Sequence, residues 1–531
     1  MTELSANSRR GVVVAPHFLA AEAGAAILKE GGNAIEAAVA AAAAIAPAYP
    51  HMNHLGGDGF WLIREPSGRI HCIEAAGYAG EKATIDFYRG QGLDAVPERG
   101  PLAALTVPGA VAGWQFVLEI SKVLGGKVPL ARLLEASISI AKKGSPVGRS
   151  MMARFASPRA AKIEAPGFKE TFLIDGKPPK FGDTLKPGRL AVTLEHLAKA
   201  GLDDFYRGDI GREIAADLAR IGSPVTRSDL ERFRALAREP IRVQLKSGTV
   251  YSSPAPTQGI TTLLILGIAE KLGHARAESF EFLHALIEAT KRATRIRTRV
   301  VTDHDHMKED LQAYLAPEAL EKEARKIDPH KAAPWPAPAG EGDTIWLGAV
   351  DASGLAVSYI QSLYFEFGSG CVLPSTGIVM QNRGYAFSLD PKALNPLQPG
   401  RRPFHTLCPA LAELSDGRIL SFGTMGGDGQ PQTNATVYAR HIGHQVPIGE
   451  AIDRPRFILG RTWGTEVTNL RVESRFPPEV VEALRKAGHA IEVLPEDYAE
   501  IMGHAGGVEI NLKGNIEGAH DRRADGGAAA A

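Results

Sequence analysis

The stretch Thr344-Ile-Trp-Leu-Gly-Ala-Val-Asp351, followed by Ala352-Ser353-Gly354 and Leu355-Ala-Val-Ser-Tyr-Ile-Gln-Ser362, decides the fold of this chain. Two runs rich in β-branched and aromatic residues flank an Asp-Ala-Ser-Gly turn, a pattern that predicts a β-hairpin. With the turn centred on Ala352 and Ser353, positions that sum to about 705 face each other. Thr344 is therefore expected opposite Gln361 or Ser362.

The hairpin follows a segment that is expected to be an exposed linker. Lys331-Ala-Ala-Pro-Trp-Pro-Ala-Pro-Ala-Gly-Glu-Gly342 contains three prolines and two glycines, which exclude a regular element. A threonine behind such a linker could attack the carbonyl of the preceding residue, Asp343, and convert that peptide to an ester. Hydrolysis would free the Thr344 α-amine, whose reference pKa of roughly 7.7–8.0 suits a base for its own hydroxyl. Asp343–Thr344 is the candidate cleavage site and Thr344 the candidate nucleophile.

Two other features would complete an amide-cleaving site. Ser362 could hydrogen-bond the Thr344 hydroxyl from the opposite strand. The loop Gly423-Thr-Met-Gly-Gly-Asp-Gly429 precedes a predicted helix over 433–441 and could offer backbone N–H groups to an oxyanion. Each feature also has an ordinary reading, because a threonine that begins a strand is usually structural and a Gly-Gly pair is usually a turn.

The composition excludes several classes of protein. Among 531 residues, 60 basic residues balance 60 acidic ones, so the field that attracts nucleic acid or an anionic membrane is missing. Three scattered cysteines, Cys72, Cys371 and Cys408, are too few for a disulfide framework or a zinc site and fit a reducing compartment. The first residues offer no apolar run long enough for a signal peptide, so none is expected. We therefore expect a cytoplasmic protein that binds neither nucleic acid nor membrane.

Apolar periodicity predicts a mixed helix and sheet protein. Ala34–Ala48 is about 15 residues long, shorter than the ~20 of a membrane span, and predicts a buried helix. Apolar residues at three and four spacing predict helices over Leu190–Ala200, Asp209–Arg220 and Ser279–Arg297. The small-residue tail, 521–531, is expected to be frayed.

Two clusters that suggest other functions have ordinary interpretations. His304 and His306 could ligate a metal, but no third ligand stands at metal-site spacing, so no metal site is predicted. The basic run Lys291–Arg299 is interpreted as a solvated helix face, since the chain has no net charge.

The chain resembles the gamma-glutamyltransferase family of N-terminal nucleophile hydrolases nearly end to end. The motifs that carry the resemblance are Glu22-Ala-Gly24, 31–39, Leu55-Gly-Gly-Asp-Gly-Phe-Trp61, 107–113, 204–208, Phe367-Gly-Ser-Gly370, Arg402-Pro403, Met425-Gly-Gly427, Arg454-Pro-Arg-Phe457 and 521–526. The resemblance implies an α+β fold, a four-layer αββα sandwich built from one precursor. It also implies a cut into a large subunit, 1–343, and a small subunit, 344–531, which form a heterodimer. It allows a dimer of heterodimers as a higher assembly.

The same resemblance implies roles for individual residues. Ser362 becomes the hydroxyl beside the nucleophile, and Gly426 and Gly427 become the oxyanion donors. It implies neither a metal nor an organic cofactor.

Substrate recognition departs from the family pattern. The arginine that holds the substrate α-carboxylate in relatives acting on glutathione is matched by Ile85, and a serine pair by His405-Thr406. The segment that binds the α-amine reads Gln381-Asn-Arg-Gly-Tyr-Ala386, and an asparagine is replaced by Tyr364. An ammonium group desolvated without a partner loses several kcal/mol of binding, so these changes disfavour a γ-glutamyl substrate. They also place a cation, Arg383, in the segment that binds the α-amine in those relatives.

The segment 358–370 is similar to that of oxamate amidohydrolases, which release ammonia from oxamate in purine-ring catabolism. This similarity predicts an amidohydrolase that cleaves a small anionic amide, most directly oxamate to oxalate and ammonia, through an acyl-enzyme on Thr344. Arg383, His405, Thr406 and Tyr364 are the candidate substrate-binding residues. The alternatives are a gamma-glutamyltransferase or glutathione hydrolase, an acylase of side-chain amides, and a catalytically silent scaffold.

Overall fold

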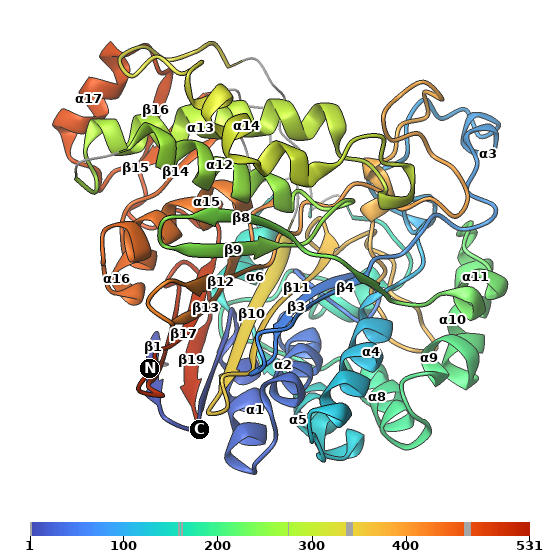
Figure 1. The fold of residues 1–531 in the computed structure, drawn as a ribbon. Coiled ribbons are helices and arrows are strands. Elements are labelled where there is room, and N and C mark those ends of the chain that lie inside the picture. The colour runs from blue at the N-terminus through green and yellow to red at the C-terminus, as the bar shows by residue number, and fades with distance from the viewer. Residues whose placement is uncertain (1–2, 158–159, 161–162, 274–275, 336–342, 461–468) are drawn as a thin grey trace.

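Two seven-stranded antiparallel sheets form the centre of the molecule (Figure 1). The computed structural model describes residues 3–157, 160, 163–273, 276–335, 343–460 and 469–531. Sheet I has the order β19 (Gly527–Ala530), β2 (Gly11–Ala15), β10 (Asp343–Asp351), β11 (Ala356–Tyr364), β3 (Asp58–Arg64), β4 (Ile70–Ala75) and β7 (Leu236–Arg238). Sheet II has the order β1 (Ser5–Ser8), β18 (Ile516–His520), β17 (Ala505–Ile510), β13 (Ile419–Thr424), β12 (Ala410–Leu414), β9 (Gly248–Ser252) and β8 (Ile241–Leu245).

Helices cover the outer face of each sheet, which gives four layers (Figure 1). Sheet I is covered by α1 (Phe18–Lys29), α2 (Ala34–Ala48) and α4 (Ala110–Val123), with α5 (Leu130–Lys143) and α8 (Gly188–Ala200) outside them. Sheet II is covered by α12 (Gly259–Leu272), α15 (Gln430–Tyr438) and α16 (Ile448–Asp453), with α13 (Phe280–Val300) packed on α12 and α15 outside them. The predicted αββα sandwich is confirmed.

Shorter elements connect these layers. The other helices are α3 (Ile85–Arg89), α6 (Arg149–Phe155), α7 (Phe168–Phe172), α9 (Asp204–Arg207), α10 (Asp209–Ile221), α11 (Arg227–Arg232), α14 (Pro317–Ala324) and α17 (Pro478–Lys486). Two small sheets contain β14 (Phe457–Leu459), β15 (Leu470–Glu473) and β16 (Ile491–Leu494), and β5 (Ser145–Pro146) and β6 (Thr184–Leu185). No helix in the described ranges is long and apolar enough to cross a membrane.

The hairpin forms close to the predicted register. In β10 and β11, Ile345 pairs with Gln361 and Asp343 with Tyr364, and the register shifts between Asp343 and Ile345. The shift is a β-bulge in β11, because Ser362 and Leu363 both lie opposite Thr344, next to the predicted scissile bond. Bulges are common next to active sites because they re-aim a side chain and locally end the pairing.

The Trp346 ring fills space between the two sheets, and its size explains why three neighbouring positions are glycine. A Cβ on Gly348 of β10, Gly423 of β13 or Gly506 of β17 would lie 2.1–2.6 Å from the Trp346 ring. Side chains alternate across a strand, so the even-numbered residues of β10 face sheet II while Ile345, Leu347 and Ala349 pack against the helices. Thr344 therefore belongs to the face between the sheets.

Two sequence-based expectations about surface segments are wrong. The tail is not frayed through its length, because Gly527–Ala530 forms β19, an edge strand paired with β2. The basic run in α13 is not wholly solvated: Lys291 and Arg297 are buried, whereas Arg295 and Arg299 are exposed. Residues 336–342 of the predicted linker lie outside the described residues.

Candidate functional site

Thr344 lies where three central strands of sheet I bring polar side chains together. Its hydroxyl donates to Ser362 Oγ over 3.1 Å, as the hairpin register predicts. On the next strand, Ser362 pairs with Asp58. Cross-strand partners project from the same face of a sheet, so Thr344, Ser362 and Asp58 form a row that faces sheet II. All three side chains are fully buried.

The predicted glycine loop lies across from this row. A Cβ on Gly423 would meet Trp346, and a Cβ on Gly348 would meet Ser421, so β13 runs antiparallel to β10 across the gap between the sheets. The same register places Thr344 opposite Met425, directly before Gly426 and Gly427. By this extrapolation the predicted oxyanion loop begins near Thr344, the candidate nucleophile.

Gly426 and Gly427 need the conformational freedom of glycine. Their φ angles are 131° and 51°, in the region that other residues rarely adopt. Successive residues in such conformations can turn their N–H groups toward one point, which suits the binding of an oxyanion.

Sequence analysis missed the residues that hold this loop. Gln258, at the start of α12, donates from Nε2 to the carbonyl oxygens of Gly427 (2.8 Å) and Thr406 (2.7 Å). Arg297 of α13 donates from Nη1 to Gln258 Oε1 (2.8 Å) and to Asp428 Oδ1 (2.6 Å). The sequence predicts a solvated helix face for Arg297. The signal that could indicate its burial is its position on the helix relative to apolar neighbours.

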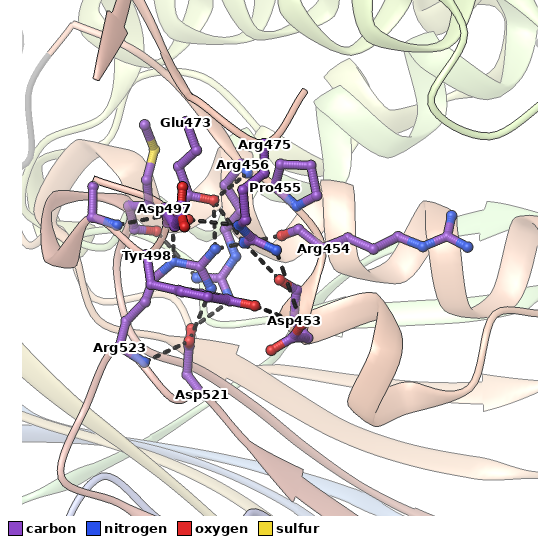
Figure 2. Close-up of polar contacts among 12 residues, drawn as sticks. Asp453, Arg454, Pro455, Arg456, Glu473, Arg475, Asp497, Tyr498, Asp521 and Arg523 are labelled. Carbon is purple, nitrogen blue, oxygen red and sulfur yellow. Dashed lines mark hydrogen bonds and ion pairs between the residues drawn. The ribbon is translucent and has the colours of Figure 1, made fainter. Parts of the chain in front are cut away.

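A buried ion network joins Arg456, Glu473, Asp521 and Arg523 (Figure 2). Arg523 donates to Glu473 (Nε to Oε1, 2.7 Å) and to Asp521 (Nη1 to Oδ1, 2.9 Å), and Arg456 pairs with Asp521. Burial alone would raise the pKa of Asp521, but the charges of Arg456 and Arg523 hold this pKa below its ordinary value. The network therefore keeps the Asp521 carboxylate ionised.

Residues 502–504 connect this ion network to the predicted oxyanion loop. Arg456 Nη1 donates to the carbonyl oxygens of Met502 (3.2 Å) and Gly503 (3.0 Å). Gly503 packs so closely on Met425 that a Cβ there would lie 2.4 Å from the Met425 carbonyl oxygen, and Met425 N donates to His504 O. The backbone before Gly426 is thus held from sheet II.

Arg383 is the cation of the site, and the predicted substrate-binding residues gather around it. Its Nη2 donates to Ser362 Oγ (3.0 Å) and its Nη1 to Thr406 Oγ1 (3.2 Å). The guanidinium carbon lies 4.0 Å from the centre of the Tyr364 ring, a cation–π contact. Tyr364 has a positive φ of 84° and donates its N–H to Ser362 Oγ (2.8 Å). Such a strained residue at a functional site must be held by its neighbours.

His405 completes the group. Its Nε2 lies 3.5 Å from Asp58 Oδ2, and its ring meets Phe60 edge-on. The pKa of His405 is held well below its ordinary value by burial and by the charge of Arg383, so the ring is neutral. Burial lowers the pKa of Arg383 to about 10, which still leaves the guanidinium charged at neutral pH. Arg383 thus gives the site a fixed positive charge, and the charge of Arg402 also lowers the pKa of His405.

The buried group of potential metal ligands outside this site already has partners. His284, Glu288 and His489 are buried together. His284 Nδ1 and His489 Nε2 are hydrogen-bonded (3.0 Å), and Lys291 Nζ pairs with Glu288 Oε1 (2.6 Å). His304 and His306 lie in a short 3-10 helix beside acidic residues. A metal at the buried cluster would have to displace the Lys291 ammonium group.

Comparisons with known proteins agree with this geometry. The chain is 50% identical over 523 residues to the oxamate amidohydrolase proenzyme of Klebsiella pneumoniae, covering 98% of each chain. It is 31% identical to the glutathione hydrolase proenzyme of Escherichia coli, over 97% of this chain and 91% of that one. The structure of a cephalosporin acylase from Bacillus halodurans superimposes with a TM-score of 0.90 at 31% identity, covering 99% and 97% of the two chains. The family model for gamma-glutamyltranspeptidase matches residues 20–531, and the chain belongs to this family.

Proposed function

We propose that the protein is a self-processing amidohydrolase that cuts itself before Thr344 and hydrolyses oxamate to oxalate and ammonia. The observation that supports this substrate is the position of Arg383. Its buried guanidinium donates a hydrogen bond to Ser362, the hydroxyl beside the proposed nucleophile. A desolvated cation is stabilised by an anionic ligand, and the buried surroundings favour a small one. The 50% identity to an oxamate amidohydrolase proenzyme supports the same substrate.

The reaction uses groups that are already assembled. The Thr344 α-amine, freed by the cut, takes the hydroxyl proton as Oγ attacks the amide carbonyl carbon of oxamate. Backbone N–H groups of Gly426 and Gly427 stabilise the negative oxygen of the tetrahedral intermediate. The C–N bond then breaks, the ammonium proton passes to the leaving nitrogen, and ammonia departs. Water hydrolyses the oxalyl ester, which releases oxalate and restores Thr344.

Processing would produce a heterodimer of residues 1–343 and 344–531. Both segments contribute strands to both sheets: in sheet I, β10 and β11 of the second segment lie between β2 and β3 of the first. The two products would therefore stay associated without the connecting bond. A dimer of heterodimers is a possible higher assembly. The three free, buried cysteines support a reducing location such as the cytoplasm.

Two assays test the proposal. A denaturing gel of the purified protein should show two fragments, the second with the amino-terminal sequence Thr-Ile-Trp-Leu, whereas Thr344→Ala should stay a single chain of 56.6 kDa. Ammonia release is then measured with oxamate, and nitroaniline release with a γ-glutamyl anilide. A cut enzyme that releases nitroaniline but no ammonia would favour the glutathione hydrolase alternative. Activity only on bulky side-chain amides would favour an acylase.

A further inference from the structure

Asp58 is a buried carboxyl group in the active-site row that the proposed reaction does not use. Its Oδ1 accepts hydrogen bonds from the N–H groups of Gly77 (2.9 Å) and Gly109 (3.1 Å) and from Gln381 Nε2 (2.9 Å). A Cβ on Gly109 would lie 2.9 Å from this oxygen, so glycine permits the approach. These three hydrogen bonds fix Oδ1 of Asp58 in place and occupy it as an acceptor.

The other oxygen belongs to a group of buried polar atoms without hydrogen-bond partners in the described part of the chain. The group consists of Asp58 Oδ2, Arg383 Nε, His405 Nδ1 and His405 Nε2. Buried polar atoms normally have partners, so several orphans in one place indicate a ligand site. Asp58 Oδ2 lies 3.5 Å from His405 Nε2, and the charge of Arg383 acts on the pKa of both residues.

Among the residues that the structure describes, Arg383 is the cation whose charge acts on Asp58. Burial raises the pKa of the Tyr206 and Tyr359 hydroxyls, which interact with Asp58, so both remain neutral. His405 is neutral as well. Burial also raises the pKa of Asp58 itself to about 7, against the opposing effects of its hydrogen bonds and Arg383. The Thr344 α-amine would join these groups after the cut.

We propose that Asp58 acts as a neutral carboxylic acid that donates a hydrogen bond from Oδ2 to the substrate carboxylate, beside the Arg383 guanidinium. The inference rests on the proposed oxamate-type substrate. Two carboxylates in one desolvated site cannot both ionise without strong repulsion, so they share a proton. With Asp58 protonated, the site has a net positive charge and an additional donor. With Asp58 ionised, the charge of Arg383 is already neutralised and the substrate carboxylate is repelled.

The assignment makes oxamate binding depend on pH in a defined direction. If only the protonated form of Asp58 binds the anion, the Michaelis constant for oxamate rises by about tenfold per pH unit above pH 7. Asp58→Asn keeps the Oδ1 acceptor, offers a permanent N–H donor and cannot ionise. The ratio of Michaelis constants, wild type over variant, should be near one at pH 6 and about 30 at pH 8.5.

The test compares cut wild-type and Asp58→Asn enzymes on two probes, oxamate and the neutral diamide oxamide. The Thr344 amine titrates in both enzymes, so its effect cancels in the ratio. For oxamide the ratio should stay within about twofold at every pH, because no second carboxylate is present. Asp351→Asn is the matched control, since it removes a buried carboxylate at the far end of β10, roughly 20 Å away at strand spacing.

Different results separate the two proposals. A ratio for oxamate that stays flat from pH 6 to 8.5, or that changes equally for oxamide, overturns the role of Asp58 while the proposed function stands. Turnover of other amides but not of oxamate, by an enzyme shown on a gel to be cut, overturns the proposed substrate and the role of Asp58 with it. If Asp58→Asn is not cut, the inhibition constant of oxalate on the wild type replaces the ratio, and an inhibition constant that does not rise above pH 7 overturns the role.

Discussion

Replacing Arg383 by leucine should remove substrate affinity with a smaller effect on the chemical step. Arg383 is fully buried, its Nη atoms bond Ser362 and Thr406, and its Nε has no partner among the described residues. A charge-assisted hydrogen bond contributes about 1.5–3 kcal/mol. Loss of two such bonds to the oxamate carboxylate costs about 3 kcal/mol at the lower limit, which corresponds to a Michaelis constant about 150-fold higher.

Ammonia release from oxamate and from oxamide measures this effect directly. Oxamide has no carboxylate, so its Michaelis constant should change by less than about threefold in the leucine variant. Arg383→Lys is the matched control: it keeps the charge but not the planar pair of donors, so it should fall between wild type and Arg383→Leu. An unchanged Michaelis constant for oxamate in a fully cut Arg383→Leu enzyme would refute the assignment. An equal loss for both substrates would show a general structural effect instead.

Other substitutions test the supports and charges of the site. Arg297→Met should lower kcat by roughly 10²–10³, because Gln258 and Asp428 lose the cation that holds the oxyanion loop; wild-type kcat in the cut variant contradicts this role. Arg523→Leu should destabilise the fold by about 3–5 kcal/mol, since Glu473 and Asp521 keep buried charges, and an unchanged unfolding midpoint in urea would count against it. The free energy of unfolding of Asp58→Asn relative to the wild type should increase by about 2–3 kcal/mol from pH 5 to pH 8. The wild type loses stability as pH rises from the unfolded pKa of about 4 to the folded pKa of about 7. Thermal midpoints at both pH values check this, and a constant difference contradicts it.

The local pattern of the sequence was sufficient for the central hairpin and for the contact between Thr344 and Ser362. Alternating residues on each side of a short turn leave little freedom of register, since a slip of one residue would turn buried side chains to the other face. Thr344 therefore lies beside Ser362 as predicted. The family resemblance extended this to the sandwich and to Gly426 and Gly427. Residues that differ from the family at the substrate site identified Arg383 as the new cation.

Contacts between distant segments were decided by tertiary structure alone. Asp58 is one residue in a glycine-rich loop, and its relation to Ser362 and His405 depends on strand pairing and on the approach of sheet II. Arg297 lies in a run of basic residues, and only the packing of α13 on the oxyanion loop buries it. The final strand, Gly527–Ala530, has weak local propensity and is ordered by β2. Near-neighbour patterns determine strands and turns, whereas burial and charge pairing depend on which surfaces the whole chain brings together.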